Sequence, residues 1–239
     1  MICRIYNRFL ILFVVWLFLS NVSFTQTNNE FKIRYNKLRN YIAEWQIHQL
    51  ADSGALIVRL PSKQKLIQIL TNNQQNKQVE QIQKQRDYEN TIIIKAFLTN
   101  YNFSPVYFTY DYLSLDIIKG KLKDVFLNEN LQIDSTIYLK QTYYLFADIQ
   151  SPIIESTLPI VPDSIAPKVS ETGSSIKTAA ILIKNQYGHQ LKRPFPYYVS
   201  GTNIMKYEKY VSKLNKNFLK FYQKTNRPQY ILELKPYLY

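Results

Sequence analysis

The feature that most constrains the fold is an alternation of helical and extended sequence patterns that continues to Ile149. Short apolar or β-branched runs predict strands, and longer stretches with apolar residues three and four positions apart predict helices. This alternation is typical of helices packed on a largely parallel sheet, because parallel strands need crossover connections. We expect strands at Ala55–Leu60, Val106–Tyr110 and Tyr143–Ile149 and a hairpin at 125–133. Helices are expected at 29–50, between Ser62 and about Asn100 with a polar break at 72–76, and between Asp111 and Gly120.

A further pair of strands and a last helix are predicted near the C-terminus. Thr178–Lys184 is expected to be a strand, and Lys192–Ser200 returns after a turn that contains Gly188. Pro194 and Pro196 favour an edge position for the return, because proline has no N–H for a central ladder. Two strands and one helix form a poor core alone, so we expect them to join the first sheet. The predicted class is α/β, with helices on a mostly parallel or mixed sheet, a C-terminal β-hairpin and a final amphipathic helix.

An apolar segment near the N-terminus predicts export. Phe9–Leu19 is a run of eleven apolar residues that follows Arg4 and Arg8 and precedes the mostly small or polar residues 20–26. Eleven helical residues span roughly 16 Å, about half of a bilayer core. The pattern is typical of a cleavable signal peptide at 1–25, and the expected location is periplasmic or secreted. The alternative is an uncleaved anchor formed by residues 9–24, which would hold the protein at the inner membrane.

Cleavage would also remove the only cysteine, Cys3, and leave a cysteine-free mature chain at 26–239. Such a chain has no disulfide, thiol nucleophile or thiolate metal site, so its core must stabilise it. We predict one α/β domain. Residues 151–177 contain four prolines among serine and threonine and show no periodicity, which predicts a linker or a long mobile loop.

The positive charge is concentrated at one end of the chain. The formal net charge is +13, and residues 178–239 carry 11 basic and only 2 acidic residues. A cationic surface outside the cytoplasm favours an anionic envelope component as the partner, and nucleic acid is not expected there. The alternative is a codon-driven compositional bias towards lysine, asparagine, isoleucine and tyrosine, which does not explain why acidic residues are missing from this end.

Four segments carry a recognisable pattern: Ala179–Lys184 with the turn that follows it, the segment 194–199 (PFPYYV), the segment 105–108 (PVYF) and the segment 125–128 (VFLN). These segments resemble exported proteins of Bacteroidota that have no assigned function. It extends over most of the mature chain and contains no catalytic motif. The resemblance therefore implies lineage and an exported location, and it implies no activity.

The predicted last helix, at about Asn203–Thr225, places its lysines on one side. By the helical angle of 100° per residue, six lysines fall within roughly an 80° sector, and the apolar residues are centred roughly 140° away. One interpretation is a cationic surface for an anionic membrane or polymer. The alternative is an ordinary surface helix with solvated lysines. We call the following six residues the lysine face: Lys206, Lys209, Lys213, Lys216, Lys220 and Lys224.

A second candidate site follows from topology. Ligands of open α/β sheets bind beyond the carboxyl ends of the strands, where this chain carries Arg59, Asp111 and Asp148. The hypothesis is that the two aspartates converge on one cleft and bind a cation or act in acid–base catalysis. The alternatives are that Asp111 is a helix N-cap and that Asp148 makes a strand-end hydrogen bond.

Other patterns argue against the common catalytic and cofactor sites. His48 and His189 are the only histidines, so a zinc site is not expected. There is no Gly-x-Ser-x-Gly elbow and no glycine-rich phosphate loop, and no metal or cofactor is expected. The leading hypothesis is a non-enzymatic binding or structural protein of the envelope. The alternatives are an enzyme with its site at Asp111 and Asp148, and an anionic-surface binder that uses the lysine face.

Overall fold

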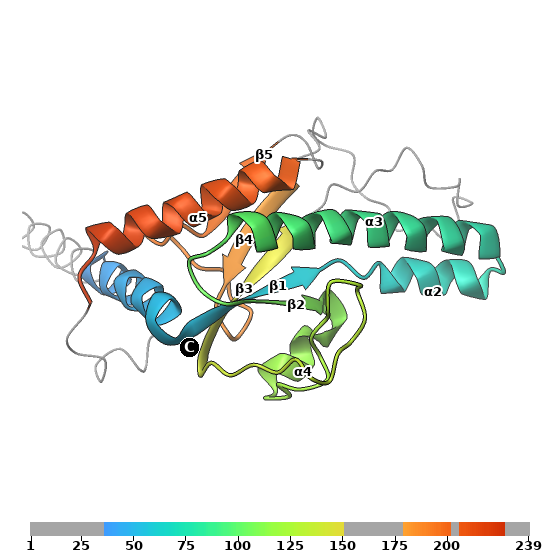
Figure 1. Ribbon diagram of the computed structural model, residues 1–239, viewed down its shortest axis with the longest axis horizontal. Helices are drawn as coiled ribbons and strands as arrows, with labels where there is room; N and C mark the ends of the chain where they lie inside the picture. Colours follow the sequence, from blue (N-terminus) through green and yellow to red (C-terminus); the bar gives the residue numbers. More distant parts are fainter. Residues whose placement is uncertain (1–35, 151–178, 202–205, 228–239) are drawn as a thin grey trace, which may run out of the picture.

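The central element of the fold is a five-stranded sheet with the strand order β2-β1-β3-β4-β5 (Figure 1). The structure is a computed structural model that describes residues 36–150, 179–201 and 206–227. The strands are β1 (Gly54–Leu60), β2 (Val106–Tyr110), β3 (Tyr143–Gln150), β4 (Ala179–Lys184) and β5 (Tyr198–Gly201).

The sheet is mixed, which confirms the predicted α/β class. β1 pairs in parallel with both β2 and β3, whereas β4 runs antiparallel to β3 and β5 runs antiparallel to β4. The C-terminal hairpin therefore extends the first sheet, as its small size required. β5 is an edge strand, in agreement with the prolines that precede it.

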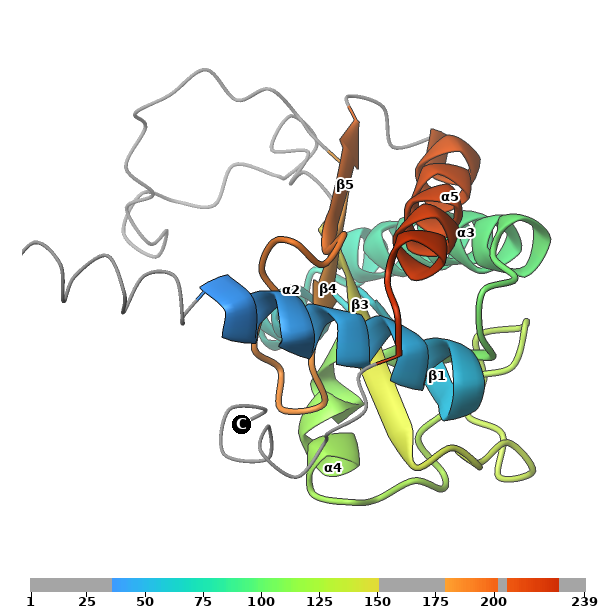
Figure 2. The same cartoon turned by 90° about the vertical axis from the view of Figure 1, so that its left-hand side faces the viewer.

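Helices cover the sheet unequally. A first helix occupies residues 36–53, and it is followed by α2 (Gln64–Asn72), α3 (Asn76–Asn100), the 3-10 turn η1 (Asp111–Leu113), α4 (Ser114–Ile118) and α5 (Tyr207–Lys224). Figures 1 and 2 show α3 and α5 side by side over one face of the sheet, with α4 beyond the other face. The last helix agrees with its predicted range within the described residues.

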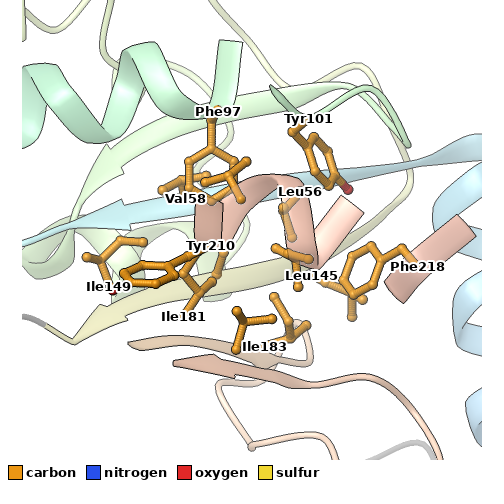
Figure 3. Packing of buried hydrophobic residues seen from close by; sticks show 14 of the residues in the cluster. Leu56, Val58, Phe97, Tyr101, Leu145, Ile149, Ile181, Ile183, Tyr210 and Phe218 are labelled. Carbon is orange, nitrogen blue, oxygen red and sulfur yellow. The ribbon is translucent and has the colours of Figure 1, made fainter. Parts of the chain in front are cut away.

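Two hydrophobic clusters lie on the two faces because side chains alternate along each strand. Leu56 and Val58 of β1 belong to the larger cluster, which includes residues of the first helix, α3 and α5 (Figure 3). Ala55 and Ile57 belong to the smaller cluster, which α4 and the segment after it complete. The two-sided burial explains why the strands are apolar runs without alternation.

The connection from β2 to β3 is less regular than predicted. The helix expected from Asp111 to Gly120 is a 3-10 turn followed by five α-helical residues. The hairpin predicted at 125–133 is reduced to a single bridge between Leu127 and Ile133. One reason is that the N–H of Leu127 donates a hydrogen bond of 2.8 Å to the carbonyl oxygen of Phe108 in β2. Leu127 is therefore bonded to the edge strand of the main sheet, and its N–H is not available for a hairpin ladder.

The turn between the first helix and β1 requires a glycine for a reason that the sequence does not show. The sequence suggests that Gly54 adopts a left-handed helix cap, but in the structure it is the first residue of β1 and its φ is not positive. A Cβ atom at this position would lie 2.7 Å from Leu50 Cα and 2.8 Å from the carbonyl oxygen of Gln49. Glycine is therefore needed for close backbone approach.

Gly54→Ala is expected to destabilise the protein by about 1–3 kcal/mol, because backbone atoms must move to accommodate the methyl group. The measurement is urea unfolding followed by circular dichroism. Ser53→Ala, at an exposed neighbouring position, is the control. An unchanged unfolding midpoint for Gly54→Ala would contradict the packing seen at this turn.

Two predicted segments, the signal peptide at 1–25 and the insert at 151–177, lie outside the described residues. Among the residues that are described, none of the helices combines the length and the apolar character that crossing a membrane requires.

Candidate functional site

The lysine face is displayed on α5 because the opposite side of this helix is part of the core. Tyr207, Val211, Leu214 and Phe218 are each at most 1% exposed, and all four belong to the larger hydrophobic cluster. Their spacing of four, three and four residues places them along one stripe of the helix. The same periodicity leaves all six lysines exposed.

The lysine face is rich in unpaired positive charge. None of its six lysines forms an ion pair within the described part of the chain. Glu208 is the only acidic residue of α5. From Lys206 to Lys224 the row is roughly 27 Å long, at 1.5 Å per helical residue. The result is a straight cationic ridge on the outside of the molecule.

Contacts along α5 fix the orientation of the ridge. Near its middle, Asn215 and Asn102 exchange two hydrogen bonds of 2.8 and 3.2 Å, which join α5 to the end of α3. At its C-terminal end, His48 Nε2 lies 3.1 Å from the carbonyl oxygen of Thr225. Because a carbonyl oxygen only accepts, this hydrogen bond requires a proton on Nε2. Beyond the helix, Arg227 pairs with Asp52 of the first helix at 3.4 Å.

Arg59 and Asp148, two of the predicted site residues, are neighbours across β1 and β3. The Arg59 guanidinium pairs with Asp148 Oδ1, and the Lys184 ammonium lies 2.6 Å from Asp148 Oδ2. The three side chains are only 16%, 15% and 26% exposed. Arg59 also lies over the ring of Phe146, 5.0 Å from its centroid. This cluster has a net charge of +1, and both oxygens of its single carboxylate are engaged.

The cluster lies at a position where α/β proteins often bind ligands. The strand order reverses between β1 and β3, since β2 is placed on one side of β1 and β3 on the other. Ligands bind beyond the carboxyl ends of strands at such a switch point. Arg59 and Asp148, which the sequence placed at the carboxyl ends of strands, are neighbours in the structure, and Lys184, which was not predicted, is the third member of the cluster.

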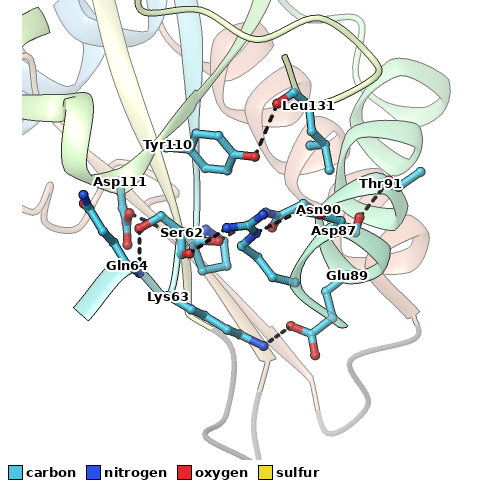
Figure 4. Close-up of polar contacts among 12 residues, drawn as sticks. Ser62, Lys63, Gln64, Asp87, Glu89, Asn90, Thr91, Tyr110, Asp111 and Leu131 are labelled. Atoms are coloured by element: carbon cyan, nitrogen blue, oxygen red, sulfur yellow. Dashed lines mark hydrogen bonds and ion pairs between the residues drawn. The ribbon is translucent and has the colours of Figure 1, made fainter. Parts of the chain in front are cut away.

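Asp111 belongs to a different group. Its Oδ1 accepts a hydrogen bond of 3.2 Å from Ser62 N–H, at the end of β1 (Figure 4). It does not cap its own helix, which corrects one of the alternatives. Leu60 pairs with Tyr110, whereas Arg59 pairs with Asp148 on the opposite side of β1. Two strand spacings of about 4.8 Å separate β2 from β3, so the two carboxylates serve separate contacts.

Side chains of α3 hold the loop that follows β1, and the sequence analysis did not single them out. The buried Asn90 donates through Nδ2 to the carbonyl oxygen of Pro61 at 3.1 Å. Arg86 donates to the carbonyl oxygen of Ser62 at 3.4 Å, and Glu89 accepts from Lys63 at 3.1 Å. Figure 4 shows how these contacts converge on the loop. These contacts hold the loop against α3, which is a structural role.

Other titratable groups do not suggest acid–base chemistry. Burial raises the pKa of the phenols of Tyr101 and Tyr143, which both lie in the core and stay neutral at ordinary pH. Burial also raises the pKa of Glu44, although the nearby His48 lowers it. His189 is in an exposed turn. Within the described residues, no group of three or more potential ligands of the His, Cys, Asp and Glu type comes together to hold a metal ion.

No protein-family model, curated protein or solved structure matches the chain. The resemblance to exported Bacteroidota proteins therefore stays a prediction. The function has to be inferred from the geometry of the described residues.

Proposed function

We propose that the protein is a non-enzymatic binder of extended anionic surfaces and that it binds them through the lysine face. The observation that carries the proposal is that all six lysines of the lysine face, five in α5 and Lys206 at its N-terminus, are exposed and form no ion pair in the described part of the chain. A lysine held near a charged membrane surface contributes about 1 kcal/mol. Six lysines acting together would therefore provide useful affinity without a binding pocket.

The attachment of α5 favours this proposal over a loosely held charged helix. Phe218 and Leu214 are fully buried, and hydrogen bonds to Asn102 and His48 fix the helix at two further points. The lysines thus share a rigid backbone, and little conformational entropy of the backbone is lost on binding.

A catalytic role has less support. Catalysis by Asp148 would require a carboxylate available to a substrate or a cation, and both of its oxygens pair with Arg59 and Lys184. Asp111 accepts a backbone hydrogen bond from Ser62 and lies beside a different strand. Within the described residues, neither side chain belongs to a group of three or more possible metal ligands.

The location that we propose is the cell envelope or the exterior. The support for it is the sequence of Phe9–Leu19, which is typical of export. Anionic lipids and acidic polymers are surfaces that an exported cationic protein meets.

Removing four charges from the lysine face is expected to weaken binding to beads that carry sulfate groups by tenfold or more, on the order of what several lysines contribute at low salt. The variant replaces four lysines by glutamine, and its matched control replaces four exposed lysines elsewhere. The readout is retention at low salt and the salt concentration at elution. The lysine-face variant carries K209Q, K213Q, K216Q and K220Q, and the control carries K65Q, K77Q, K119Q and K123Q.

Both variants lose the same net charge, so a general charge effect would lower retention equally in both. Earlier elution of the lysine-face variant alone would support the proposal. Equal elution of the two variants would overturn it.

A further inference from the structure

We infer that the surface bound by the lysine face is an anionic phospholipid bilayer; this inference rests on the proposed function. Three properties of α5 carry it: the kind of cation that it displays, the position of its aromatic residues, and the convex shape of the ridge.

The cations of α5 are all lysines. The helix Tyr207–Lys224 contains no arginine. The planar guanidinium of arginine binds an individual carboxylate or phosphate through two parallel hydrogen bonds, and proteins use it where a specific acidic group must be recognised. An ammonium acts as a point charge without a preferred orientation. A row of ammonium groups therefore fits a surface with many equivalent, mobile phosphates better than it fits one acidic polymer chain.

The aromatic residues of α5 are turned away from the lysines. Tyr207, Tyr210 and Phe218 are buried, and Phe221 and Tyr222 are partly buried against the larger hydrophobic cluster. Proteins that bind single-stranded nucleic acids, a well-studied class of flexible polyanion, stack the rings of the polymer on exposed aromatic side chains beside their positive charges. Leu219, which is 39% exposed, lies roughly 100° from the centre of the lysine sector. The lysine face itself offers charge without rings to stack on.

The convex shape of the ridge also favours a bilayer over a polymer chain. A straight α-helix presents its outward side chains on a convex surface, and α5 lies in the outer layer of the molecule (Figure 2). A chain binder usually follows its polymer along a charged groove. A flat bilayer, in contrast, can touch the whole row of roughly 27 Å at once. The helix would lie parallel to the membrane plane with its aromatic side still buried in the protein.

The test is co-sedimentation of the full chain with vesicles of phosphatidylcholine, with and without phosphatidylglycerol. Phosphatidylglycerol is expected to increase binding, and about 0.5 M salt is expected to remove the increase because screening then acts within a few ångströms. The variant K209Q/K213Q/K216Q/K220Q is expected to lose about a hundredfold in affinity for the anionic vesicles, whereas K65Q/K77Q/K119Q/K123Q keeps most of it. All forms contain Phe9–Leu19, so insertion of this segment cannot cause the difference between the variants.

Calorimetry of the same proteins with soluble polyphosphate separates the claim that the lysine face binds anions from the claim that its partner is a bilayer. Binding to phosphatidylglycerol vesicles that is lost in the lysine-face variant alone supports the bilayer. Binding to polyphosphate through the lysine face without binding to vesicles overturns the bilayer and leaves the proposed function standing. Binding to neither partner, or equal binding by the two variants, overturns both.

Discussion

Replacing Phe218 by alanine is expected to lower the free energy of unfolding by about 3–5 kcal/mol, the usual cost of removing a buried aromatic ring. Phe218 is fully buried, and its ring lies 5.4 Å from that of Phe103 and 5.5 Å from that of Phe195. Both contacts are edge-to-face, and a third ring, Tyr101, lies 6.3 Å away. The substitution would leave a cavity where α5, the end of α3 and the segment before β5 meet.

Urea unfolding followed by circular dichroism measures this effect. Leu219→Ala is the control on the same helix, because Leu219 is 39% exposed and its loss creates no enclosed cavity. A loss of similar size for the two variants would contradict the packing of α5. A much larger loss for Phe218→Ala would confirm that the ring holds the lysine face in position.

Asp148→Ala is expected to destabilise the protein by about 2–3 kcal/mol. Removing one partner of a buried ion pair typically costs about 3–5 kcal/mol, because the remaining charge is left unpaired, and access to water reduces this cost. Here two cations would remain, Arg59 and Lys184, and all three side chains are about one-quarter exposed or less.

The comparison for Asp148 is Glu80→Ala, which removes the exposed pair with Lys84 on α3 and should leave stability almost unchanged. A triple variant, R59M/D148L/K184M, should recover much of the stability lost in Asp148→Ala, because apolar residues of similar volume can replace a buried ion cluster. Failure of Asp148→Ala to change stability would show that the cluster is not structural. The catalytic hypothesis would then regain support.

Much of the fold was predictable because local sequence patterns were sufficient to identify the helices and strands and the sides that they bury. The strand Ala55–Leu60 and the helix α5 each have a periodicity that identifies both the element and its buried side. The lysine face was found in the same way, since a single helix determines which of its residues share a side. The edge position of β5 followed from the chemistry of proline.

The features that were missed depend on contacts between distant segments. Whether Asp111 and Asp148 converge depends on strand order, which places β1 between them. Asn90 is a buried polar residue because the carbonyl oxygen of Pro61 needs a donor, and no pattern within α3 shows this. Gly54 is required by the backbone of the preceding helix, although its position suggested a left-handed cap. Each case needs the tertiary structure.

The most direct test of the central claim is the affinity of the two charge-matched variants for the same phosphatidylglycerol vesicles at low salt. We expect that replacing Lys209, Lys213, Lys216 and Lys220 weakens binding about a hundredfold, whereas replacing four lysines elsewhere leaves most of the affinity in place. Circular dichroism of both variants checks that the fold is intact. Equal affinities for two folded variants would contradict a binding role for the lysine face.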